Sequence, residues 1–180
     1  EVPQKVKPLP KDFKSLKVLA EKGDARAQYN LGAMYARGDG IPEDNKEAVK
    51  WWRKAAKQGD ATSQFNLGVR YAYGKGVERD AKEAVRWYRK AAMQGHADAQ
   101  NNLGLMYDNG EGVLEDDVTA YAWYNIAAAN EGALAQKNKG IIANEMTPEQ
   151  IAEAQKLSRE LLEHIAKKKA PSETEKPKGK

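Results

Sequence analysis

The apolar and polar positions of this chain repeat with a period of 36 residues. Gly23, Gly59 and Gly95 keep this interval, and five residues after each one begins a segment of the form Gln-x-Asn-Leu-Gly. Further residues in the same register are Tyr35, Tyr71 and Tyr107; Trp51, Trp87 and Trp123; and the glycine pairs 38/40, 74/76 and 110/112. The chain therefore contains tandem copies of one structural unit.

Each copy predicts two antiparallel helices. In the first copy, apolar positions at helical spacing run from about Ala25 to Arg37 and from about Asn45 to Gln58. A glycine that can adopt the left-handed conformation follows both runs, and a Gly-x-Gly segment joins them. A single helix pair cannot bury its own apolar face, so we predict an all-α fold, an α/α superhelical solenoid of antiparallel helix pairs.

The predicted domain organisation follows the repeat register. A capping box at Thr147-Pro148-Glu149-Gln150 opens a long last helix, whose apolar stripe includes Leu157 and Leu162. The predicted boundaries are an extended N-terminal segment, 1–10; a repeat domain, 11–166; and a disordered basic tail, 167–180. Within the repeat domain they are a capping helix, 11–23; repeats 24–59, 60–95 and 96–131; and a degenerate helix with the long capping helix, 132–166.

The constant positions of the repeat predict the core, and the variable positions predict the ligand surface. The repeated aromatic residues could stack on a sugar or a cofactor, but we interpret them as packing because they recur at a fixed phase. The opposite face of the first helix in each copy varies, and would line the concave groove of a solenoid. The predicted partner-binding residues on this face are Arg26, Tyr29, Asn30, Arg37, Phe65, Asn66, Val69, Tyr73, Asn102, Leu105 and Asn109.

One position at the edge of this face is constant: Asn30, Asn66 and Asn102, with Asn138 in the last unit. An amide side chain both donates and accepts, so a row of Asn could bind the backbone of an extended peptide. Alternatively, each Asn could tie neighbouring repeats together. The sequence does not distinguish these two interpretations.

The net charge of +4 lies at the ends of the chain. Residues 11–166 contain 22 Lys and Arg against 23 Asp and Glu, a net of 22 − 23 = −1. We therefore predict no nucleic-acid partner, and the lack of a long apolar run predicts no membrane insertion. The outer face of the second helices is basic, with Lys50 and Arg86 among its residues, but carboxylates within helical reach favour a solvated surface.

The repeated pattern consists of four segments in order: Ala-x-x-Gln-(Tyr/Phe)-Asn-Leu-Gly-x-x-Tyr, Gly-x-Gly-(Val/Ile), Ala-x-x-Trp-(Tyr/Trp) and Ala-Ala-x-x-Gly. This pattern resembles the Sel1-like repeat. This repeat is a bacterial relative of the tetratricopeptide repeat, and the similarity covers about Phe13 to Leu162. It implies an adaptor or scaffold, often exported and linked to signalling, envelope maintenance or contact with host cells. Cys-rich members have been described as β-lactamases or penicillin binders, but this chain contains no Cys.

We therefore expect a scaffold or adaptor that binds a partner's extended peptide or loop in the concave groove. The alternative is an exported, envelope-associated or host-interaction factor with weak β-lactamase-like hydrolase or cell-wall-polymer binding activity. We expect no catalytic residues, metal site or cofactor, because His96 and His164 lack partners at the spacing of a triad or metal site.

The repeat pattern bears on neither the oligomeric state nor the compartment. We expect a monomer. The chain starts at Glu1 rather than at Met, which suggests a mature periplasmic or secreted protein, and a cytoplasmic location is the alternative.

Overall fold

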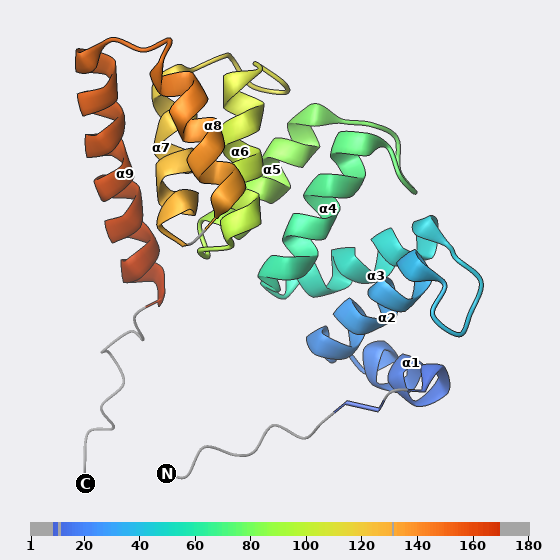
Figure 1. Cartoon of the computed structure of the whole chain (residues 1–180). Helices are drawn as coiled ribbons and strands as arrows, with labels where there is room; N and C mark the ends of the chain where they lie inside the picture. Colours follow the sequence, from blue (N-terminus) through green and yellow to red (C-terminus); the bar gives the residue numbers. More distant parts are fainter. Residues whose placement is uncertain (1–8, 11, 131, 170–180) are drawn as a thin grey trace, which may run out of the picture. The chain divides into compact units, whose positions relative to one another are not determined.

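The computed structural model describes residues 9–10, 12–130 and 132–169. Within these ranges the chain is all-α, with nine helices in sequential antiparallel pairs (Figure 1). The helices are α1 (Phe13–Glu21), α2 (Ala25–Arg37), α3 (Asn45–Lys57), α4 (Ala61–Tyr73), α5 (Ala81–Ala92), α6 (Ala97–Asp108), α7 (Asp117–Ala129), α8 (Ala133–Ala143) and α9 (Pro148–Lys169). They form two compact units, residues 1–88 and 89–180, which divide within α5.

The helix boundaries of the first copy follow the sequence pattern closely. α2 has the predicted limits, and α3 ends one residue before the predicted Gln58. Asp24 and Asp60 cap α2 and α4 by accepting backbone N–H groups of Ala27 at 2.8 Å and Ser63 at 2.6 Å. Gly38, after α2, has a φ of 70°, as its predicted left-handed role requires.

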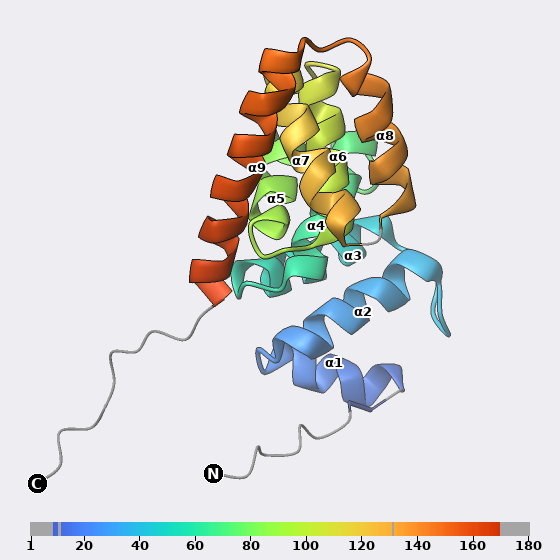
Figure 2. The same ribbon diagram turned by 60° about the vertical axis from the view of Figure 1, so that its left-hand side comes forward.

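In the first unit, α2 lies between α1 and α3, and α4 packs on α3 (Figures 1 and 2). The core here consists of aliphatic side chains and of aromatic rings from the second helix of each copy, as the repeat predicts. Trp51 and Trp52 on α3 are both buried, and Leu31 and Leu67 on α2 and α4 are fully buried.

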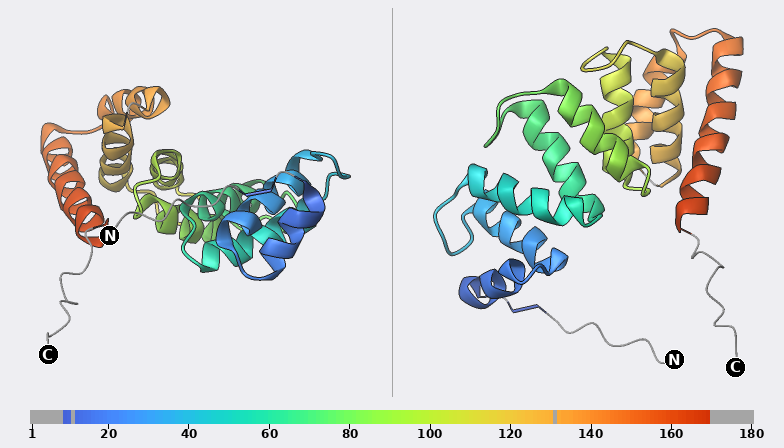
Figure 3. Two further views of the ribbon diagram at one scale, coloured as in Figure 1. Left: turned by 90° about the horizontal axis from the view of Figure 1, so that it is seen from below. Right: turned by 180° about the vertical axis from the view of Figure 1, so that it is seen from behind.

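In the second unit, α7 contacts α6, α8 and α9, and the long α9 runs beside α7 (Figure 3). Thr147 and Gln150 form the predicted capping box: the Thr147 backbone N–H donates to Gln150 Oε1 at 2.8 Å, and the Gln150 N–H donates to Thr147 Oγ1 at 3.3 Å. α9 continues to Lys169, past the predicted start of the tail at 167. The rest of that predicted tail, 170–180, and residues 1–8 of the predicted N-terminal segment lie outside the described residues.

Candidate partner-binding surface

The predicted surface of the first unit lies on α2 and α4. Arg26, Arg37 and Tyr73 are exposed, and the exposed fraction of Tyr73 is 69%. The remaining predicted residues of this unit are half-buried: Tyr29, Asn30, Phe65, Asn66 and Val69. Tyr73 is therefore the aromatic ring in this set that is most available to a partner.

Two of the half-buried aromatic residues also stabilise the fold. The backbone carbonyl of Tyr29 accepts the indole N–H of Trp52 at 3.1 Å, and the Tyr29 side chain packs on the core cluster that contains Trp52. The centroid of the Phe65 ring lies 6.0 Å from the centroid of the Tyr88 ring. Replacing Tyr29 or Phe65 would consequently disturb the packing of the core as well as the predicted partner-binding surface.

In the second unit, the predicted residues Asn102 and Leu105 lie on α6, and Asn109 follows that helix. Leu105 is 41% exposed, and two apolar side chains of α8, Leu134 and Ile141, are 61% and 52% exposed. α8 also contacts α6. Sequence reasoning missed Leu134 and Ile141, although a signal existed, because Ile141 follows Leu105 at the 36-residue interval.

The row of Asn residues divides between two roles. Asn30 Nδ2 donates to the backbone carbonyl of Arg26 at 2.9 Å, within α2. Asn138 Nδ2 donates across to α6, to Asn101 Oδ1 at 3.1 Å, and Asn101 Nδ2 reaches Asn102 Oδ1 at 3.4 Å. Asn138 therefore ties neighbouring helix pairs together, whereas Asn30 does not.

The constant Gln of each copy binds the preceding second helix. Gln28 Nε2 donates to Ala20 O at 3.0 Å. The same bond recurs 36 and 72 residues later, from Gln64 to Ala56 O and from Gln100 to Ala92 O, at 3.1 Å in both cases. These buried amides hold adjacent helices together, and a ligand on the surface would not reach them.

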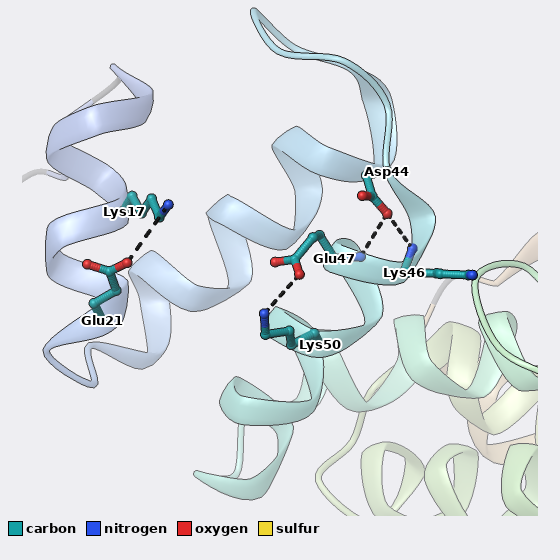
Figure 4. Close-up of polar contacts among 6 residues, drawn as sticks. All are labelled: Lys17, Glu21, Asp44, Lys46, Glu47 and Lys50. Carbon is teal, nitrogen blue, oxygen red and sulfur yellow. Dashed lines mark hydrogen bonds and ion pairs between the residues drawn. The ribbon is translucent and has the colours of Figure 1, made fainter.

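The basic outer face of the second helices is largely paired within the chain. Lys50 Nζ donates to Glu47 Oε1 at 2.8 Å, a hydrogen bond that is drawn as a dashed line in Figure 4, and it raises the pKa of Lys50. In the same view Asp44 Oδ1 accepts the backbone N–H groups of Lys46 and Glu47, which caps α3. Arg86 pairs with Glu83 on α5. These contacts support the interpretation of a solvated surface.

Two arginines of the same face connect to the next helix instead. Arg53 Nη2 donates to the hydroxyl of Tyr71 at 2.8 Å, and Arg89 donates to the hydroxyl of Tyr107. The pairs are one repeat apart, so this bond belongs to the stacking of the repeat. Neither guanidinium therefore stands free for a partner.

His96 takes the place of Asp24 and Asp60 and performs the same capping role. Its Nδ1 accepts the backbone N–H of Ala99 at 3.4 Å, at the start of α6. Within the described ranges, no three His, Cys, Asp or Glu side chains gather as metal ligands would. None of the helices described here is both long and apolar enough to span a bilayer.

Tandem antiparallel helix pairs with a buried aromatic stripe and a variable exposed face define the chain as a helical-repeat protein. It belongs to the Sel1 repeat family, which matches residues 25–60, 61–96 and 97–131. This match concerns a repeat scaffold and names no catalytic activity.

Solved structures support the family and the fold. A protective antigen of uropathogenic Escherichia coli, c5321, is 39% identical with a TM-score of 0.79, over 93% of this chain and 38% of that one. A Sel1 repeat protein from Oxalobacter formigenes is 40% identical with a TM-score of 0.66, over 73% of this chain and 98% of that one. Cysteine-rich protein B of Helicobacter pylori, at 21% identity and a TM-score of 0.58, shows the fold alone.

A putative sel1-like repeat-containing protein, L18, of Acanthamoeba polyphaga mimivirus is 45% identical over 42 residues. That match spans 23% of this chain and only 7% of the viral protein. The chain thus covers a small part of L18 and well under half of c5321.

Proposed function

We propose that this protein binds a segment of another protein on the exposed faces of its first helices, α2 and α4 in one unit and α6 and α8 in the other. The observation that carries the proposal is that three apolar side chains of the neighbouring helices α6 and α8 are exposed: Leu105, Leu134 and Ile141. Exposed apolar residues that gather on neighbouring helices mark interaction surfaces more often than residues that occur singly. Helical repeats present such surfaces at the positions that vary between copies.

Charge suggests the chemistry of the segment that would bind the second unit. α6 carries Asp98 and Asp108, whereas α8 carries Lys137 and Lys139. Complementary charge steers association and weakens with added salt. Because these charges balance, the surface on α6 and α8 favours a segment that is mainly apolar and without a large net charge.

The test truncates two of these three exposed side chains and leaves buried residues unchanged. Leu134→Ala combined with Ile141→Ala should weaken binding of a cross-linked and identified partner about tenfold or more, since truncated interface anchors commonly cost over 1 kcal/mol. Leu114→Ala is the matched control, because Leu114 is 89% exposed in the loop after α6 and lies outside the proposed surface. Isothermal titration of the purified pair measures the affinities, and circular dichroism checks the helices.

Equal affinity for the double variant and the Leu114→Ala control would show that the partner binds elsewhere. Tyr73→Ala then serves as a second arm in the first unit. If neither Tyr73→Ala nor the double variant weakens binding, the proposal fails for both units.

We also propose that the partner lies outside the cytoplasm, in the periplasm or beyond the cell. The resemblance of c5321, a protective antigen, supports a location that is accessible from outside. Cross-linking in intact cells, followed by separate capture from envelope and cytosol fractions, tests this proposal. Recovery of the chain and its partner from the cytosol alone would contradict it.

A further inference from the structure

A hollow of about 370 Å³ opens in the first unit, where the described chain begins. The segment before α1, one residue of α1, and the exposed side of α2 with the turn after it supply its walls. The lining residues are Leu9, Pro10, Leu16, Asn30, Met34, Arg37 and Asp39. Leu9 also packs on the core cluster that contains Leu16, so the hollow has a fixed apolar wall.

The repeat register relates the residues of this hollow to those of the next copy. The residue 36 positions after Leu16 is Trp52, and the residue 36 positions after Met34 is Arg70. In that next copy the Arg70 guanidinium lies 5.1 Å from the centroid of the Trp52 ring. Arg70 Nη1 also donates to Asn45 Oδ1, at the position equivalent to Leu9, at 2.8 Å. The next copy thus carries an indole ring, which packs against α2, and a guanidinium at the positions where the first copy has the smaller Leu16 and Met34.

The chemistry of the walls suits an aromatic ring. Leu9, Leu16 and Met34 offer apolar surface, and a methionine sulfur makes favourable contacts with aromatic rings. The carboxylate of Asp39, held by Arg37 Nε at 2.6 Å, and the amide of Asn30 lie among the lining groups. These oxygens can accept a hydrogen bond from an indole N–H or a phenol O–H.

We propose that this hollow binds an aromatic side chain, preferably an indole, that a partner protein presents. Residues 1–8 and 170–180 of this chain contain no Phe, Tyr or Trp, so neither segment can supply the ring. The proposal rests on the proposed function in that another protein carries the aromatic residue. It names the anchor of that partner, at the edge of the surface formed by α2.

The test uses N-acetyl-L-tryptophanamide as the probe and needs no partner. The four methionines are labelled at their methyl carbons, and Met34 reports from the hollow. We expect a saturable shift of the Met34 methyl signal, with a dissociation constant on the order of 1 mM for so small a ligand. The buried Met106 and Met146 should not shift, and N-acetyl-L-alaninamide should shift none of them.

Two variants of α1 place a ring inside or outside the hollow. Leu16→Trp introduces the residue of the next copy and should weaken probe binding at least tenfold. Val18→Trp is the matched control, since Val18 is exposed on α1 and does not line the hollow, and it should bind the probe as the natural chain does. Absence of a Met34 shift in the natural chain, or an equal shift in Leu16→Trp, overturns the proposal.

The remaining outcomes separate this proposal from others. A Met34 shift that depends on protein concentration without any probe would show that a second copy supplies the ring, which also overturns it. Probe binding that persists while the Leu134 and Ile141 variants keep full affinity for the partner supports the hollow and refutes the proposed surface of the second unit. If the probe does not bind but the Leu134 and Ile141 variants weaken partner binding, the aromatic site in the hollow is refuted and the proposed surface of the second unit is supported.

Discussion

Gly32, Gly68 and Gly104 lie inside helices, where glycine is ordinarily unfavourable, because aromatic rings occupy the space of a side chain. A Cβ atom at Gly32 would lie 2.7 Å from the Trp52 ring, and one at Gly104 would lie 2.8 Å from the Tyr124 ring. Gly68 faces Tyr88 in the same way. The constant glycine of the repeat thus allows the second helix to approach the first closely.

This contact predicts opposite effects for two Gly→Ala substitutions in helices. Gly68→Ala should lower the free energy of unfolding by about 1–2 kcal/mol, since overpacking against the buried Tyr88 outweighs the gain in helix propensity. Gly140→Ala in α8 should raise it by roughly 0.5–1 kcal/mol, because no atom lies within 4 Å of the added Cβ. Urea unfolding followed by circular dichroism measures both. A stabilised Gly68→Ala variant would show that Tyr88 moves aside freely.

The sequence predicted the buried residues better than the exposed ones. Leu31 and Trp51 belong to the core as expected, because constancy across copies reports packing. Asn101 occupies a variable position, yet it is buried, because Asn138 of α8 hydrogen-bonds to it. The position of a residue along a helix gives the direction of its side chain, but whether the side chain is buried depends on the neighbouring helix. Here that neighbour is α8, whose sequence departs from the repeat pattern, so its contact with Asn101 was hard to predict.

At the scale of helices, the ends were predicted more accurately than the buried stripe of α9. Leu162 belongs to the expected apolar stripe but is exposed, while Ser158 is buried. Leu162 lies roughly 80° around the helix from Ala154, at the margin of the buried side. Ser158 lies nearer the centre of that side, and its hydroxyl donates to Ala154 O at 2.8 Å and lies 3.3 Å from Ala122 O. Because a serine is polar, the pattern of apolar residues does not predict that Ser158 is buried, although its hydroxyl forms a hydrogen bond within the helix.

The capping box of α9 makes a direct prediction for the stability of that helix. Thr147→Ala should lower the free energy of unfolding by about 1 kcal/mol, because the N–H of Gln150 loses its acceptor. Thr147→Ser retains the hydroxyl and should stay within a few tenths of a kcal/mol of the natural chain. Thermal unfolding of both variants measures the difference. Equal loss in the two variants would attribute the effect to the threonine methyl group instead.

At the scale of the whole molecule, contacts join helices that are near neighbours in the chain. Within the first unit α2 contacts α1 and α3, and within the second α7 contacts α6, α8 and α9. Stability in such repeats is approximately a sum of terms from each unit and its nearest neighbours. Damage to one copy should therefore remain local.

Amide hydrogen exchange tests this locality. Trp52→Ala removes a buried ring and should cost about 3–5 kcal/mol, with protection falling in α2, α3 and α4. Protection in α7 and α9 should change little. Tyr124→Ala is the matched variant in the second unit and should show the opposite distribution. Uniform loss of protection along the chain in either variant would mean that the two units unfold together.

The hydrogen bond from each constant Gln to the helix before it has an evolutionary consequence. Every 36-residue copy brings its own donor, Gln28, Gln64 or Gln100, and the two later bonds use a carbonyl of the copy before, at Ala56 and Ala92. A tandem duplication of one copy in the gene would therefore insert a unit that already matches both neighbours. The number of repeats can change by such events without any compensating substitution, while the variable positions are free to diverge afterwards.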